Sequence, residues 1–156
     1  MFAANARKAF TLIELIAVLV VLAILSGVAL PRYFDYTDRA RSSAVQGTLG
    51  GVRTALTNYY VEQSVSGTAA YPTLAQLTTA GTVMLEPIPT NPYNGLSNVT
   101  AATAAEATNR TVAGTAGWRY YVDNTTTPPV AVFYCNASDA TQVSDGAGGF
   151  ETANDL

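Results

Sequence analysis

A long apolar run near the N-terminus constrains this chain more than any other feature. From Phe10 to Leu30 the only strongly polar residue is Glu14, and the run meets the requirement of about 20 residues for a helix that spans a bilayer. Fourteen of its residues are Phe, Leu, Ile or Val, which together favour insertion by roughly 4 to 8 kcal/mol. One carboxylate costs about 2.5 to 3.5 kcal/mol at the bilayer centre, and less near the end of a span. The run is therefore predicted to span a membrane in spite of Glu14.

The charges that flank this run predict its orientation. Arg7 and Lys8 precede it, and no acidic residue offsets them. Because basic flanks are retained on the cytoplasmic side, we expect a cytoplasmic N-terminus and an extracytoplasmic body.

Composition excludes several classes of function. The chain has no histidine, which excludes Ser-His and Cys-His catalysis and His-ligated zinc, and we expect a protein that is not an enzyme. Its eight Lys and Arg residues are scattered and its net charge is -3, so nucleic acid is not expected as a partner. The single cysteine, Cys135, is expected to be a buried thiol, with pairing to another chain as the alternative.

Two ordinary explanations compete for the apolar run. A secretory signal peptide would be cut after Ala29, where Gly27 and Ala29 form a small-x-small site. A plain membrane anchor explains the length and the flanks equally well. Neither explanation gives Glu14 a role.

A third explanation rests on resemblance. The stretch Lys8-Ala9-Phe10-Thr11-Leu12-Ile13-Glu14-Leu15, followed by the apolar run and Pro31, resembles the N-terminus of type IV pilins and type II secretion pseudopilins. The resemblance implies that prepilin peptidase removes residues 1–9, cutting between Ala9 and Phe10, and N-methylates Phe10. Glu14 then corresponds to the glutamate at the fifth position of the mature family members. Ala9 stands where the family usually has glycine.

The same resemblance implies a filament subunit. The precursor would lie in the bacterial inner membrane, meet an assembly platform there, and then join identical subunits in a periplasmic or cell-surface filament. A buried carboxylate is costly unless a cation meets it, so we expect Glu14 to pair with the Phe10 amine of a neighbouring subunit. The alternatives are a major pseudopilin of a type II secretion system and a secreted or anchored binding module.

Beyond Pro31 the pattern becomes amphipathic. Apolar residues recur in steps of three and four along one helix face, namely at Val45, Leu49, Val52, Leu56 and Tyr59 or Tyr60. A helix is predicted from about Phe10 to Val61 or Gln63, with residues 10–31 in the membrane or filament core and 32–63 carrying a body of residues 64–156. Pro31 is expected to kink the helix or loosen one turn.

The body is predicted to contain a β-hairpin. Aromatic and β-branched residues fill Trp118 to Val122 and Val130 to Tyr134. Because side chains alternate along a strand, one face of each strand is expected to press on the helix; those six residues are Trp118, Tyr120, Val122, Val130, Val132 and Tyr134. Residues 100–116 are expected to form a surface excursion with little strand. The predicted fold is α+β, a long N-terminal helix packed on a small antiparallel sheet, as in pilins.

Calcium is the only cofactor that the sequence suggests. The glycine-rich tail carries Asp139, Asp145, Glu151 and Asp155, and oxygen ligands of this kind suit that ion. A solvated acidic tail explains the same residues.

Four Asn-x-Ser/Thr sequons occur, at Asn98, Asn109, Asn124 and Asn136. They are attributed to chance in a chain so rich in Asn and Thr.

Overall fold

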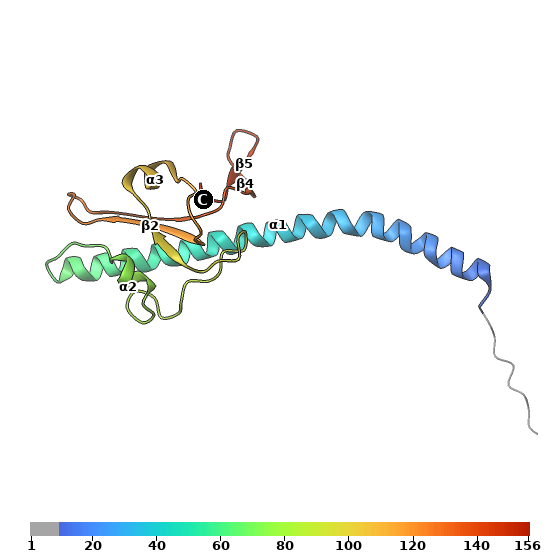
Figure 1. Ribbon diagram of the computed structural model, residues 1–156, viewed down its shortest axis with the longest axis horizontal. Helices are drawn as coiled ribbons and strands as arrows, with labels where there is room; N and C mark the ends of the chain where they lie inside the picture. Colours follow the sequence, from blue (N-terminus) through green and yellow to red (C-terminus); the bar gives the residue numbers. More distant parts are fainter. Residues whose placement is uncertain (1–9) are drawn as a thin grey trace, which may run out of the picture. The chain divides into compact units, whose positions relative to one another are not determined.

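A computed structural model describes residues 10–156 of the chain, which divide into a unit ending at Thr37 and a second unit, Asp38–Leu156. Figure 1 labels helices and strands in chain order. The helices are α1 (Leu12–Val65), α2 (Leu74–Thr78) and α3 (Ala104–Asn109). The strands are β1 (Val99–Ala101), β2 (Trp118–Asp123), β3 (Val130–Cys135), β4 (Ala140–Ser144) and β5 (Phe150–Thr152).

The predicted long helix is confirmed as α1. Among the described residues it is the one helix long and apolar enough to cross a membrane, with a mean hydropathy of 2.8 over its most apolar window. None of that window is buried within the chain. The helix continues through Pro31 without a break; the kink expected there stays a prediction.

The core of the second unit forms between α1 and one face of a three-stranded sheet. Ser42, Val45, Leu49, Val52 and Leu56 are the buried residues of α1. The four apolar ones belong to the same cluster as Trp118, Tyr120 and Phe133. Full burial of an aliphatic or aromatic side chain contributes about 1.5 to 3 kcal/mol. The amphipathic stripe predicted from the sequence is thus confirmed as the helix side of this core.

The register of the hairpin corrects the prediction for β3. Strands β2 and β3 pair antiparallel, with Tyr120 opposite Phe133 and Trp118 opposite Cys135. Since cross-strand partners point to the same face, the core face of β3 carries Ala131, Phe133 and Cys135. The expectation that Val130, Val132 and Tyr134 face the helix is wrong: they share the opposite face with Arg119 and Tyr121. Residues Trp118, Tyr120 and Val122 do lie on the core side, as predicted.

The opposite face of this sheet is partly covered by residues that were expected to be irregular. Strand β1 pairs in parallel with β2, so the sheet is mixed, in the order β1-β2-β3. Helix α3 then packs on β2 and β3. Thr103 and Glu106 cap its first turn reciprocally. These capping bonds stabilise a short helix whose small side chains alone would not hold it together. The α+β, pilin-like fold class is confirmed, with these additions.

Tight backbone approaches join the segment before β1 to the sheet. A Cβ on Gly117 would lie 2.0 Å from the Leu96 oxygen, so only glycine fits. The buried Asn91 amide donates to the Gly117 oxygen at 2.8 Å and lies 3.1 Å from the Cys135 sulfur. Cys135 is a free, buried cysteine, as predicted.

Strands β4 and β5 form a separate two-stranded sheet that the sequence did not predict.

Candidate functional site

The N-terminal turn of α1 holds Glu14 in a reciprocal hydrogen-bonded pair with Thr11. The Thr11 backbone N–H and hydroxyl both donate to Glu14 Oε2, at 2.9 and 2.8 Å, and the Glu14 N–H donates to Thr11 Oγ1 at 3.3 Å. This arrangement is a capping box, with Thr11 as the N-cap of a helix that begins at Leu12. Sequence reasoning missed it, although the signal, Thr followed three residues later by Glu, is present.

The capping bonds leave Glu14 able to accept a further partner. A carboxylate has about four acceptor positions on its two oxygens, and both Thr11 donors reach the same oxygen, Oε2. A cation can therefore approach Oε1 without displacing Thr11. A negative charge in the first turn is also favoured by the helix dipole.

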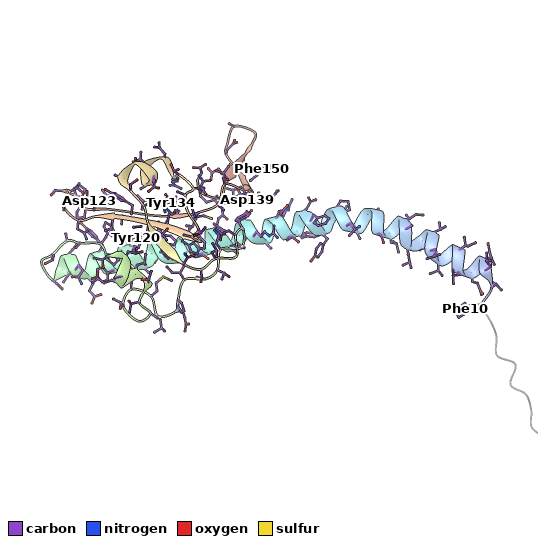
Figure 2. All side chains as sticks on the ribbon, viewed as in Figure 1. Phe10, Tyr120, Asp123, Tyr134, Asp139 and Phe150 are labelled. Carbon is purple, nitrogen blue, oxygen red and sulfur yellow. The ribbon has the colours of Figure 1, made fainter. Side chains whose placement is uncertain are left out.

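The rest of this site is an uncovered apolar helix surface. Phe10 is 89% exposed, Leu12 76% and Ile13 70%, and the larger apolar residues through Leu30 are all exposed. Figure 2 shows these side chains projecting from the first half of α1, beginning at Phe10. Continuous apolar surface of this extent marks a membrane or protein interface. Ala9, the other half of the expected cut site, lies outside the described residues.

The four acids suggested as calcium ligands, Asp139, Asp145, Glu151 and Asp155, do not converge on one site among the described residues. Asp145 Oδ1 accepts from the N–H groups of Ala147 and Gly149 at 2.7 and 2.9 Å, and these bonds lower its pKa. Glu151 and Asp155 line a shared hollow of about 320 Å³. Within residues 10–156, no group of three or more His, Cys, Asp or Glu side chains is placed to hold a metal. Calcium binding stays a prediction.

The four sequon asparagines are used inside the fold. Each amide nitrogen donates to a backbone oxygen: Asn98 to Thr115, Asn109 to Ala105, Asn124 to Tyr71, and Asn136 to Ala113 and Ala116. These contacts explain the asparagines without a glycan.

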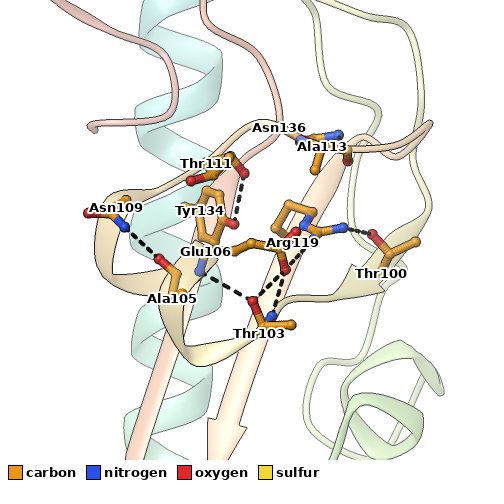
Figure 3. A network of polar contacts seen from close by, with 10 residues as sticks. All are labelled: Thr100, Thr103, Ala105, Glu106, Asn109, Thr111, Ala113, Arg119, Tyr134 and Asn136. Atoms are coloured by element: carbon orange, nitrogen blue, oxygen red, sulfur yellow. Dashed lines mark hydrogen bonds and ion pairs between the residues drawn. The ribbon is translucent and has the colours of Figure 1, made fainter.

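A polar network that the sequence did not reveal fastens α3 to the sheet (Figure 3). Arg119, whose side chain is 8% exposed, forms an ion pair with Glu106 at 2.7 Å and donates to Thr100 Oγ1 at 3.2 Å. Tyr134 donates to the Thr111 oxygen at 3.1 Å. Removing one partner of a buried pair is costly because the other charge stays desolvated. The network therefore fixes the position of α3, and its members come from segments too far apart for local patterns to show.

Comparison with known proteins starts from the N-terminus. Residues 4–30 match the family model of the prokaryotic N-terminal methylation motif. The chain is 44% identical over 59 residues to the type IV major pilin protein PilE of Neisseria gonorrhoeae, covering 38% of this chain and 35% of that protein. It is 47% identical over 55 residues to a fimbrial protein of Neisseria meningitidis, covering 35% and 32%. In both matches the chain spans about a third of the relative's length.

A longer match extends into the body. The chain is 34% identical over 120 residues to fimbrial protein Q of Moraxella bovis, covering 70% of this chain and 76% of that protein. No solved structure matches. The N-terminal methylation motif, the exposed apolar helix with Glu14 at its start and the match along most of the body lead to one assignment: the chain belongs to the type IV pilin family.

Proposed function

We propose that this chain is a prepilin, cut by prepilin peptidase between Ala9 and Phe10, N-methylated at Phe10 and polymerised through its N-terminal helix. The precursor lies in the bacterial inner membrane with a cytoplasmic N-terminus. An assembly platform in that membrane transfers it into a filament of identical subunits. The methylation motif over residues 4–30 supports the processing steps.

One observation carries the assembly step: the apolar first half of α1 is wholly exposed in the single chain. Lipid covers this surface in the precursor. Outside the membrane, burial against identical helices is the alternative to contact with water, and it is favoured by roughly 25 cal/mol for each Å² removed from water. The helix can thus serve first as an anchor and then as a filament core.

Glu14 gives this helix packing a register. A carboxylate moved into an apolar core needs a cation, because a buried unpaired charge is penalised more than a buried pair is rewarded. The amine of Phe10, free after cleavage, would supply this cation from a neighbouring copy that is offset along the filament axis. Since Thr11 occupies Oε2, the amine would be accepted by Oε1. Other offsets would leave both charges unpaired.

A pilus is favoured over a secretion pseudopilus. The relatives described above are named as pilin or fimbrial proteins, which favours a surface fibre. The acidic, glycine-rich tail is the feature that keeps the major pseudopilin of a type II secretion system as the alternative.

Expression in a bacterium that has a type IV assembly system but lacks its own major pilin tests the proposal. The surface fraction is sheared from the cells, examined by electron microscopy and probed with an antibody against residues 64–156. We expect filaments that contain the chain. Recovery of the chain as a freely secreted monomer, with no filaments, would contradict the proposal and favour a binding module.

A further inference from the structure

Two arginines from distant parts of the chain line one hollow on the second unit. Arg53 lies on α1, Arg110 follows α3, and the hollow between them has a volume of about 250 Å³. The half-buried apolar residues of its lining are Tyr71, Ala131 and Val132. The hollow, called here the two-arginine pocket, combines positive charge with an apolar wall.

Neither positive charge has an acidic side chain as an ion-pair partner within the described part of the chain. There, ion pairs join Arg41 to Asp38 and Arg119 to Glu106. Arg53 Nη2 donates to the Leu156 oxygen at 2.8 Å, and Arg110 Nη1 donates to the same oxygen at 3.2 Å. Even a terminal carboxylate at Leu156 would offset only one of the two charges.

Arg53 lies close to a second cation, Arg110. Burial and the nearby charge of Arg110 lower the pKa of Arg53. Glu151 and Asp155 line a neighbouring hollow that Arg53 also borders. Among the described residues, neither carboxylate forms an ion pair with Arg53. A carboxylate that reached the two-arginine pocket could accept paired, charge-assisted hydrogen bonds from guanidinium groups.

The backbone at Arg110 is also unusual for an arginine. Arg110 caps α3 in the left-handed conformation, at φ 47° and ψ 44°, a position that favours glycine or asparagine. Arginine at this position directs a long cation from the end of a short helix toward α1. Its Nη1 reaches the Asp155 oxygen at 2.7 Å, so the guanidinium is held in place at the edge of the pocket.

A complementary surface lies elsewhere on the same unit. Leu85 is 84% exposed, and Glu86 beside it is exposed as well. The neighbours on both sides are anchored: Met84 packs against the core, and Ile88 is buried within it. The Gly81 N–H donates to the Met84 oxygen at 2.7 Å, which closes a turn just before Leu85. The chain therefore presents an apolar side chain and a carboxylate together on a fixed loop.

We propose that Leu85 and Glu86 of one subunit dock in the two-arginine pocket of the next. Leu85 covers the wall formed by Tyr71, Ala131 and Val132, and Glu86 pairs with Arg53 and Arg110. The two surfaces differ, so the contact is head to tail, and repetition of such a contact builds an open helical filament. The contact rests on the proposed function and adds to it a second bond between subunits, made by the bodies.

Disulfide trapping between separately marked subunits tests this contact. A full-length Leu85→Cys chain is produced together with a full-length Thr57→Cys chain, since Thr57 is exposed and lines the pocket. The native Cys135 is buried and leaves the background low. After mild oxidation of sheared filaments we expect a disulfide-linked dimer. The matched control pairs Leu85→Cys with Ala147→Cys, which is exposed outside the pocket.

A charge exchange provides the second measurement. Glu86→Arg should reduce filament yield by about tenfold or more, because like charges then meet across the contact, and Arg53→Glu together with Arg110→Glu should restore it. Glu62→Arg, the same change at an exposed acid of α1 outside the pocket, should not reduce it.

The outcomes separate this contact from the proposed function. The contact is overturned if the unaltered chain forms filaments but the pair of Leu85→Cys and Thr57→Cys gives no dimer, or no more dimer than the control pair. The proposed function would then still stand. Normal filaments from Glu86→Arg would overturn the contact in the same way. Absence of filaments from the unaltered chain would overturn both.

Discussion

Thr11 and Glu14 cap the first turn of α1 by donating to one another: two Thr11 donors reach Glu14 Oε2, and the Glu14 N–H reaches Thr11 Oγ1. The carboxylate in the apolar run thus has a role within its own chain before any neighbour is present. A capping bond of this kind is worth about 1 kcal/mol. Its role in the single chain and its proposed role in assembly can be separated by substitution.

Glu14→Ala is expected to leave membrane insertion intact and to abolish or strongly reduce filaments. Insertion is unaffected because removing a charge only favours the apolar run. Thr11→Val is the control, since it removes the hydroxyl of the capping box but keeps the carboxylate. If both variants lost filaments equally, capping alone would explain Glu14; normal filaments from Glu14→Ala would remove its proposed role in assembly.

Alanine substitutions on β3 test the register of the hairpin. Phe133 is buried opposite Tyr120, so Phe133→Ala should lower the free energy of unfolding by about 3 to 5 kcal/mol. Val132 faces away from α1, and Val132→Ala should lower it by only about 1 kcal/mol. Urea denaturation of the detergent-solubilised chain measures both. The reverse order would mean that Val132 lies on the core face.

The Glu106 carboxylate should make stability depend on pH. Hydrogen bonds from the Thr103 backbone and hydroxyl, followed by the charge of Arg119, lower the pKa of Glu106 from its ordinary value of 4.5. A folded-state pKa below the unfolded one stabilises the fold above the unfolded pKa, and that stabilisation is lost as pH falls through the folded value. In Glu106→Gln the loss of stability between neutral pH and about pH 3 should therefore be smaller than in the unaltered chain. Equal losses in urea denaturation would contradict this role.

The Cys135 thiol should be unreactive while the chain is folded. Burial raises its pKa to about 11, and the thiolate is the reactive form. We expect little alkylation at about pH 8 in native conditions and rapid alkylation once urea unfolds the chain. Mass spectrometry follows the modification. Rapid labelling of the native chain would show that the thiol is accessible.

Calcium should raise the melting temperature if the acidic tail binds it, because a ligand that binds the folded state stabilises that state. Asp145→Asn should abolish the response, and a chelator should reverse it in the unaltered chain. Asp35→Asn, outside the tail, serves as the control. An unchanged melting temperature over a wide range of calcium concentrations would remove the prediction.

Periodicity explains which parts of the fold could be predicted. The steps of three and four along Val45, Leu49, Val52 and Leu56 identify a helix face without further information, and the core confirms it. The two strands of the hairpin follow from aromatic and β-branched runs. Which face of β3 meets the helix depends on register. The loop of residues 124–129 contains turn-forming residues but is too long to fix the register by a two-residue turn.

Other features had weaker signals or none. Helix α3 is built mainly from small residues, and only the spacing of Thr103 and Glu106 marked its start. The expected roles of Phe10 and Glu14 came from a contiguous motif, which a sequence displays directly. The two-arginine pocket joins residues that are distant in the chain, so only the tertiary fold brings them together.

Intact-mass measurement with N-terminal sequencing of the chain in sheared filaments tests the central claim most directly. Processing and assembly as proposed predict a single mature species that begins with N-methyl-Phe10. A chain that begins at Leu30, as a conventional signal peptide predicts, or that retains Met1, would contradict the account.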